Sequence, residues 1–206
     1  FIDTVYLLQM KKYAVKFPLI SKEFDLIEKQ LIDTVNDGHF IFPHLHPHWL
    51  DAQYNPDLNE WELLSIEKYK FKDISQDIKT DLFDRSMDLL NEIVDKSSGS
   101  YAINAYRAGG WSVQPILDFK EHFIQHGILY DMSVYPGKYV NSQAHWFDFR
   151  RAPQCDYYLF DEDIVKQNMN GKFRELTISS LVFSKLEKWI YFKIGGLNKR
   201  LGLVKQ

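Results

Sequence analysis

The chain has 206 residues, of which 45% are hydrophobic and 16% aromatic, and its formal net charge is -3. This length and apolar content predict a single domain over residues 1–206 with a sizeable core. Basic and acidic residues are interspersed without a basic stripe, so no nucleic-acid partner is expected.

Cysteine content and hydropathy bear on where the protein resides. The only cysteine, Cys155, excludes an intrachain disulfide framework and favours a reducing, cytoplasmic location. No apolar run reaches the roughly 18 residues that a bilayer-spanning helix needs, so no transmembrane segment is expected. The chain starts at Phe1, without Met and inside an apolar run, which predicts an upstream segment of the same domain.

The first half of the chain alternates between apolar stretches and polar connections. Residues 1–2 predict the end of a strand that passes into a short helix at residues 5–8. Apolar residues at helical spacing predict an amphipathic helix over residues 21–37. Residues 39–42 then predict a short buried strand, and residues 51–72 an elaborated loop that shapes a cleft.

The second half repeats this alternation. Helices are predicted at residues 74–94, 115–126 and 181–194, and strands at residues 101–106, 128–130 and 173–178. The stretch from Pro136 to Tyr157 has no clear period and is predicted to be a loop. Strand, loop and helix in repeated order favour parallel strands with helices outside them, as in an α/β barrel or open sheet. In both folds the loops after the strands gather at one face, where ligands bind.

Three histidines, His44, His46 and His48, follow the strand predicted at residues 39–42. Neutral imidazole is a common ligand of zinc-like ions, so this density indicates a metal site. An extended backbone would place His44 and His46 on one face, whereas a turn would bring His44 and His48 together. Pro47 favours the turn, and His46 would then point away from its neighbours. The alternative is a His-rich surface loop or histidines packed around Trp49.

Two further loops follow predicted strands and are expected beside the histidines. One contains Arg107, Gly109 and Gly110, and the glycines permit a tight turn there. The other begins at Asp131, which either orients the site or caps a turn. A second histidine pair, His122 and His126, lies four residues apart at the end of a predicted helix, where capping is the preferred interpretation.

Four stretches resemble motifs of the NodB-type polysaccharide deacetylase superfamily, in a divergent branch linked to surface-polysaccharide genes. They are Gly-His-Phe-Ile-Phe-Pro-His-Leu-His-Pro-His (38–48), Arg-Ala-Gly-Gly-Trp (107–111), Tyr-Asp-Met-Ser-Val-Tyr-Pro (130–136) and Arg-Glu-Leu-Thr-Ile-Ser (174–179). The resemblance implies a distorted, incomplete (β/α) barrel. It also implies a metal-dependent enzyme that removes acetyl groups from an N-acetylated carbohydrate in surface-polysaccharide biosynthesis or modification.

The resemblance assigns roles residue by residue. His44 and His48 correspond to the ligands of Zn²⁺ or another divalent transition metal, and Arg107 to the arginine that orients or ionises a carboxylate base. Four further residues are expected either to contact the substrate or to support the metal ligands: His46, Trp49, Trp111 and Asp131. Trp61 is a further candidate for stacking on a sugar, with packing as the alternative for each tryptophan.

The chain departs from the superfamily at both ends. The Asp-Asp motif that supplies the base and the third metal ligand is absent, and residues 1–4 resemble the strand that follows it. The closing Leu-x-Leu-x-His motif is also absent, so no general acid is identified, and His145 is only a substitute candidate. Two other functions stay open: a C–N hydrolase acting on a small cyclic amide, and a catalytically inactive barrel that binds glycan.

Overall fold

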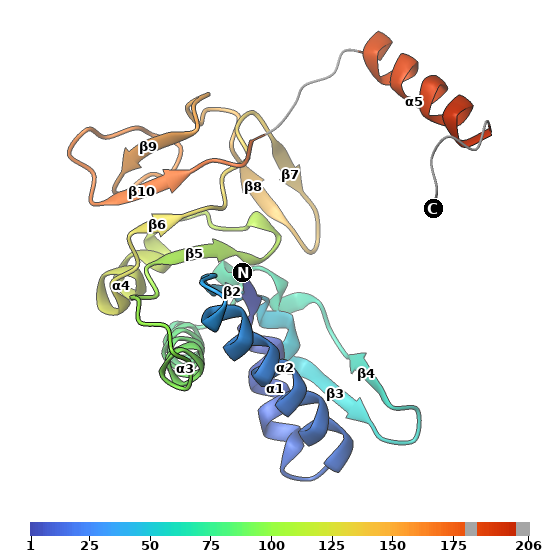
Figure 1. Cartoon of the computed structure of the whole chain (residues 1–206). Helices are drawn as coiled ribbons and strands as arrows, with labels where there is room; N and C mark the ends of the chain where they lie inside the picture. The colour runs from blue at the N-terminus through green and yellow to red at the C-terminus, as the bar shows by residue number, and fades with distance from the viewer. Residues whose placement is uncertain (180–184, 201–206) are drawn as a thin grey trace.

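The centre of the molecule is a six-stranded sheet. In a computed structural model, which describes residues 1–179 and 185–200, the strands are ordered β1-β2-β5-β6-β10-β9 (Figure 1). Their bounds are Ile2–Asp3 (β1), Pro43–Leu45 (β2), Ala105–Ala108 (β5), Tyr130–Asp131 (β6), Tyr157–Phe160 (β9) and Phe173–Leu176 (β10). The first five strands in this order pair in parallel, and β9 pairs antiparallel with β10. The α/β class with a mostly parallel sheet is therefore confirmed.

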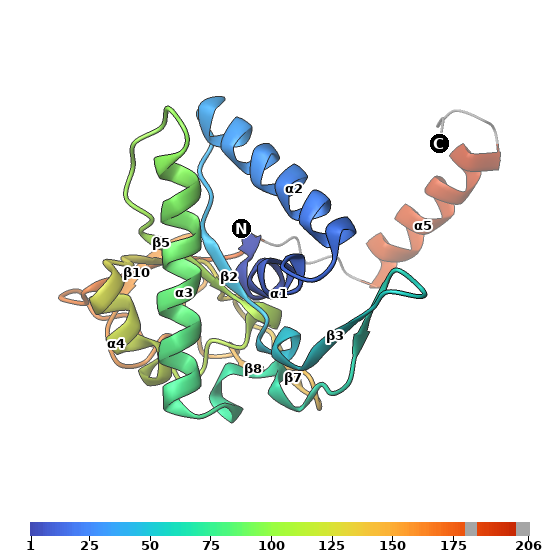
Figure 2. The same cartoon turned by 90° about the horizontal axis from the view of Figure 1, so that it is seen from below.

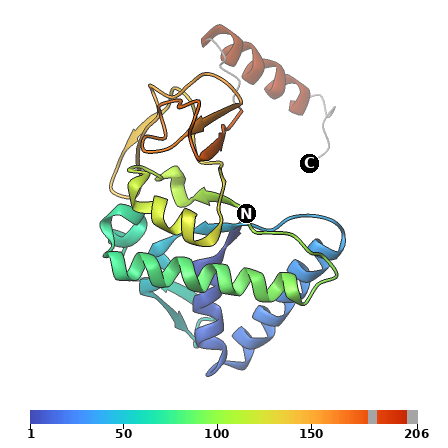
Figure 3. The same cartoon turned by 90° about the vertical axis from the view of Figure 1, so that its left-hand side faces the viewer.

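The first four helices pack together on the sheet side of the molecule, the second of them on the first and third, and a fifth helix stands apart (Figure 1). These four helices are α1 (Thr4–Ala14), α2 (Pro18–Asn36), α3 (Gln76–Asp95) and α4 (Leu117–His126). Helices α1, α2 and α3 contact one another, and α4 contacts α3. Figures 2 and 3 show α3 and α4 lying across the strands on the same side of the sheet. None of the helices in the described part of the chain has the length and apolar character needed to cross a bilayer.

Helix α2 illustrates why the periodic segments fold as predicted. Pro18 occupies its first turn, where the missing N–H costs nothing, and Gly38 follows its end with a φ of 86°. Ile20, Phe24 and Val35 are buried at helical spacing. The helix therefore begins three residues before the predicted start and ends at the predicted stop.

Between the helices and the sheet lies an aromatic core. Phe83 of α3, Tyr106 of β5 and Phe119 and Phe123 of α4 are at most 1% exposed. Their ring centroids lie 5.3–6.3 Å apart, with tilted or edge-to-face geometry. Such pairs stabilise beyond the area they bury, by roughly 0.5–1.5 kcal/mol each. This core holds β5 against α3 and α4.

Two hairpins were not expected. Strands β3 (Ala52–Asn55) and β4 (Glu60–Leu63) form within residues 51–72, and β7 (Tyr139–Asn141) and β8 (Trp146–Asp148) within the segment predicted as a long loop (Figure 1). The prediction of loops was wrong in these two places. Each strand has only three or four residues, which is too few to show a period of two.

Three strands of the sheet, β2, β5 and β6, begin further along the chain than predicted. Residues 39–42 are not a strand, because Phe40 and Phe42 pack against Tyr101, whose hydroxyl accepts a hydrogen bond from Ile41 N at 2.8 Å. Strand β2 begins only at Pro43, so His44 lies inside a strand. Helix α5 (Lys185–Arg200) overlaps the predicted closing helix, whose residues 181–184 lie outside the described residues.

Candidate functional site

The candidate site lies at the carboxyl ends of the parallel strands. The register pairs Asp3 with His44 and His44 with Arg107, so consecutive strands β1, β2 and β5 place these three residues in one row. Side chains of paired residues in parallel strands point to the same face of a sheet. The expectation that the histidine stretch and the Arg107 loop lie together is therefore confirmed.

An open hollow of about 380 Å³ lies over this row. This volume is within the range of small-molecule sites, roughly 300–1,000 Å³. Imidazole, guanidinium and aromatic groups surround it, contributed by Phe1, His44, His46, Tyr69, Arg107, Gly110, Trp111 and His145. Of the predicted site residues, His48, Trp49 and Asp131 do not line it.

His44 is held by the neighbouring strand. Its Nδ1 lies 2.8 Å from the carbonyl oxygen of Arg107, which can only accept, so Nδ1 carries the proton. The lone pair is then on Nε2, the atom a metal ion would bind. Burial lowers the pKa of His44, an effect partly offset by this hydrogen bond, and the imidazole is neutral at pH 7. Metal-binding histidines are typically oriented in this way, through the ring nitrogen that does not bind the ion.

His46 is held by a carboxylate. Its Nδ1 lies 2.8 Å from Asp3 Oδ2, which also accepts from Trp49 Nε1 at 2.9 Å. The expectation that His46 points away from its neighbours was wrong, since its ring centroid lies 4.5 Å from that of His44 and 5.5 Å from that of His48. The carboxylate of Asp3 turns the ring into the hollow. Asp3 has no role in the motif comparison, yet it orients two residues of the site.

His48 lies behind this pair. It belongs to the 3-10 turn Pro47–Asp51, and its ring stacks on Tyr69 at 4.5 Å with an interplanar angle of 7°. The residue is 7% exposed, and burial lowers its pKa. Within the part of the chain that the structure describes, His48 Nδ1 has no hydrogen-bond partner. The predicted turn at Pro47 is present, and the ring of His46 contacts the rings of both His44 and His48.

The turn after β5 depends on its glycines. A Cβ at Gly109 would lie 2.5 Å from His46 Cδ2 and would collide with the carbonyl oxygen of Leu45. Gly110 has a φ of 56° and Trp111 a φ of 57°, both in the left-handed region. Non-glycine residues in this region are uncommon and often lie at functional sites. The glycines let the turn approach His46, and Trp111 reaches the hollow from a strained backbone.

Arg107 lines the hollow with its charged group. The guanidinium carbon lies 5.8 Å from the centroid of the Phe1 ring. No ion pair of Arg107 is present among residues 1–179 and 185–200. The role of Arg107 in holding a carboxylate base therefore stays a prediction.

Asp131 does not line the hollow and contributes to the site through a hydrogen-bond network. It is fully buried and accepts hydrogen bonds from Ser133 N at 2.8 Å and from Ser133 Oγ at 3.0 Å. Ser133 Oγ in turn accepts from Ala108 N at 2.8 Å, one residue after Arg107. The network thus fixes the end of β5, so Asp131 positions the backbone next to Arg107 rather than touching the hollow.

A second buried carboxyl, Glu175 of β10, pairs with Asp131. Glu175 Oε1 accepts from Val134 N at 3.0 Å, and Oε2 meets no N–H or O–H donor among the described residues. Burial raises the pKa of both groups, to about 6 for Asp131, and the negative charge of Asp131 raises that of Glu175 further. The raised pKa values favour one proton shared by the two carboxyls, with Glu175 the more readily protonated of them.

Two residues of the hollow come from segments whose sequence shows no clear hydrophobic period. Tyr69 lies in the 3-10 turn Glu67–Tyr69, and His145 in the connection between β7 and β8. Their rings stack at 4.8 Å, so His48, Tyr69 and His145 form one column. Burial lowers the pKa of His145, with a smaller contribution from His46. The sequence had singled out His145 only as a substitute general acid, and it gave no indication of Tyr69.

The donor set tests whether these residues fit a metal. Among residues 1–179 and 185–200, no group of three or more His, Cys, Asp or Glu side chains is arranged to hold an ion. His44 and His46 have Nδ1 fixed and Nε2 free, as metal-binding imidazoles require. The described residues therefore fit two of the three protein ligands that a catalytic zinc site uses.

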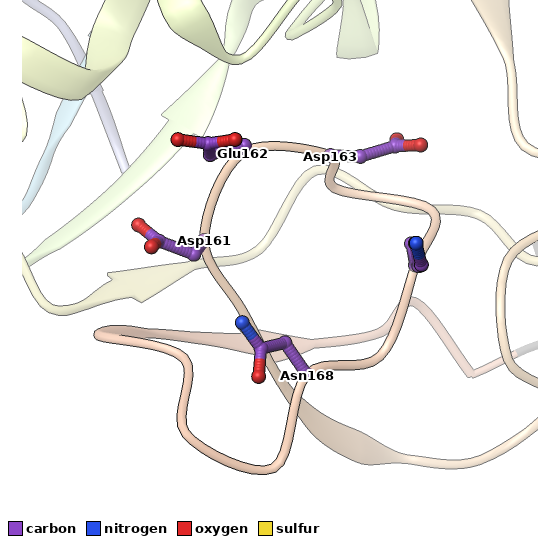
Figure 4. A pocket seen from close by; sticks show the side chains of 5 residues that line it. Asp161, Glu162, Asp163 and Asn168 are labelled. Atoms are coloured by element: carbon purple, nitrogen blue, oxygen red, sulfur yellow. The ribbon is translucent and has the colours of Figure 1, made fainter.

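A larger hollow of about 650 Å³ lies elsewhere, within the loop after β9. It is lined by Asp161, Glu162, Asp163, Lys166 and Asn168. Figure 4 shows the carboxylates of Glu162 and Asp163 pointing in opposite directions, and Asp161 Oδ1 lies 2.9 Å from Lys120 Nζ. Without converging donors, this hollow is the opening of a loop and not a ligand site.

Comparisons with models of protein families, with curated proteins and with solved structures find no match to this chain.

Proposed function

We propose that the protein is a metal-dependent N-deacetylase that acts on a carbohydrate in surface-polysaccharide biosynthesis or modification. The observation that carries the proposal is the pair His44 and His46, each with Nδ1 fixed by an acceptor, in one hollow at the carboxyl ends of the strands. Paired imidazoles with supported orientation are typical of metal sites. The motif resemblance points to His44 and His48, so it shares only His44 with this pair.

The proposal extends to the fold, a distorted, incomplete (β/α) barrel of the polysaccharide deacetylase type. From β1 to β10, the parallel strands follow one another in the sheet in their order along the chain. Barrels have this order, whereas doubly wound sheets reverse direction at a switch point. Among the described residues, β1 and β9 are the edges of the sheet and do not pair with each other.

Several residues in and beside the hollow would have tasks in this reaction. His44 would hold the metal together with His48, as the resemblance implies, or with His46, which lines the hollow. When bound, a zinc-like ion supplies an acidified water and polarises the acetyl carbonyl. Arg107 would keep a carboxylate base ionised, since a nearby guanidinium lowers a carboxyl pKa by about 1–3 units. Trp111 would offer an aromatic face to a sugar ring.

Zinc content tests the metal assignment. We expect His44→Ala to abolish zinc binding. Of His46→Ala and His48→Ala, the variant that loses more zinc identifies the second ligand. His39→Ala, at an exposed histidine of the same segment, is the matched control. Elemental analysis after dialysis gives the zinc content, and undiminished zinc in all three variants would overturn the assignment. Acetate release from a panel of N-acetylated sugars then tests the reaction.

One observation favours a second candidate, a barrel that binds glycan without cleaving it. The described residues offer fewer than three converging metal donors, yet three aromatic rings line the hollow. Binding of an N-acetylated oligosaccharide that quenches Trp111 fluorescence, without acetate release at any zinc concentration, would support this candidate over the enzyme. A cyclic-amide hydrolase has no observation in its favour.

A further inference from the structure

Helix α5 carries an apolar surface that nothing in the described part of the chain covers. Figures 1, 2 and 3 all show it away from the sheet and its helices. Six large apolar side chains on it are 41–73% exposed: Leu186, Trp189, Ile190, Tyr191, Phe192 and Ile194. Isolated exposed apolar residues are ordinary, but a contiguous group of this kind marks an interaction surface.

Four of these residues lie on one face of the helix, whereas Tyr191 and Phe192 lie outside it. Leu186, Ile190 and Ile194 recur every four residues, and Trp189 lies beside them at the i+3 position. Lys193 falls within the same stripe, with its ammonium 5.8 Å from the centroid of the Trp189 ring. A long lysine stem can lie along an apolar surface while its charge reaches the aqueous boundary.

The charge of α5 is opposite to that of the rest of the chain. Its 16 residues contain five basic side chains and one acidic, a formal charge of +4. The other 190 residues contain 20 basic and 27 acidic side chains. Such an asymmetry within one chain points to a polyanionic surface as the partner of the basic segment.

The backbone of α5 also requires a partner surface. Gly195 and Gly196 are adjacent within it, and a glycine inside a helix is destabilising relative to alanine. Isolated helices of about 12–15 residues are marginal in water even with favourable sequences. A surface that buries the apolar stripe would offset this cost.

We propose that α5 binds the surface of an anionic lipid bilayer, with its apolar stripe in the headgroup boundary and its lysines against lipid phosphates. Basic residues interleaved with Trp, Tyr and Phe are the composition of helices that lie in the membrane interface. Each Lys or Arg near an anionic leaflet adds to the attraction, which salt screens. This proposal is independent of the chemistry at His44.

Co-sedimentation of the full chain with vesicles tests the proposal. We expect binding to vesicles of phosphatidylcholine mixed with phosphatidylglycerol, weaker binding as salt rises, and little binding to phosphatidylcholine alone. Lys188→Glu/Lys193→Glu should lower the partition coefficient by at least about tenfold. The matched control is Lys16→Glu/Lys22→Glu, at two exposed lysines, one between α1 and α2 and one in α2. Trp189→Ser should weaken binding, whereas Val15→Ser at another exposed apolar side chain should not.

Three outcomes would overturn the proposal. The first is absence of binding to the anionic vesicles, and the second is equal binding by the wild type and Lys188→Glu/Lys193→Glu. The third is self-association in light scattering that Trp189→Ser abolishes, without vesicle binding, which would assign the stripe to a second copy of the chain.

Discussion

Replacing Glu175 by Gln tests whether the buried carboxyl pair holds a proton in the folded protein. Gln preserves the shape of the side chain and can still donate to Asp131, but it cannot titrate. In the folded protein, burial and the charge of Asp131 raise the pKa of Glu175 well above its ordinary 4.5. In the unfolded chain this group releases its proton near that ordinary value.

The sign of the effect follows from proton linkage. Between the unfolded and the folded pKa of Glu175, the folded wild type binds one proton more than the unfolded chain, so its stability falls as pH rises. One proton corresponds to about 1.4 kcal/mol per pH unit. The free energy of unfolding of Glu175→Gln minus that of the wild type should therefore increase by about 1.4 kcal/mol per pH unit above about pH 5. The variant thus becomes the more stable of the two as pH rises.

Urea unfolding followed by tryptophan fluorescence, at a series of pH values from about 5 to 8, measures this difference. Glu60→Gln, at an exposed glutamate, is the matched control and should give no slope. Because Asp131 and Glu175 are coupled, replacing Glu175 also changes the titration of Asp131. The difference in free energy of unfolding between the two proteins therefore reports on the carboxyl pair and not on Glu175 alone. Parallel curves for wild type and Glu175→Gln would refute the shared proton.

Three further predictions concern stability and are measured by urea or thermal unfolding. Gly109→Ala should destabilise by about 1–3 kcal/mol, because its Cβ meets the backbone of Leu45 and the ring of His46; an unchanged midpoint would mean that the turn has room. Asp3→Asn should cost about 1–3 kcal/mol, because either orientation of the amide points its NH₂ at a donor, at His46 and Trp49 on one side or at Tyr6 N on the other; wild-type stability would show that the carboxylate is dispensable. Burial lowers the pKa of His122, so the unfolded chain binds the extra proton and stability is lost as pH falls below 6.5. His122→Phe, which keeps the stack on Phe83, should lose less between about pH 7 and pH 5, and an identical acid-side loss would place its cause elsewhere.

Periodicity predicted the helices because each one buries a face against the core. Leu82, Leu89 and Ile93 of α3 are at most 1% exposed, and their spacing is visible in the sequence. The start of β2 was misplaced for a different reason. Residues 39–42 are apolar, as a strand would be, but Phe40 and Phe42 pack against Tyr101 instead of entering the sheet. Composition alone does not distinguish these two uses of an apolar run.

The site was predictable in its location but not in its detail. Strand order brings the ends of β2 and β5 together, which places His44 beside Arg107. The direction of His46 depends instead on Asp3, a contact across 43 positions of sequence. Tyr69 and His145 reach the hollow through short turns whose geometry no local pattern indicates. Side chains positioned by distant hydrogen bonds and stacking are thus the part that sequence reasoning missed.

The orientation of His44 follows from the burial of its neighbour. Leu45 is 1% exposed, and its side chain points to the opposite face of β2, into the core. A shift of β2 by one residue would expose Leu45 and turn His44 inward. Burying a leucine side chain stabilises by about 1.5–3 kcal/mol, and the unpaired imidazole would add the cost of burying a polar group. The apolar residue between two histidines therefore sets the register that points His44 to the hollow.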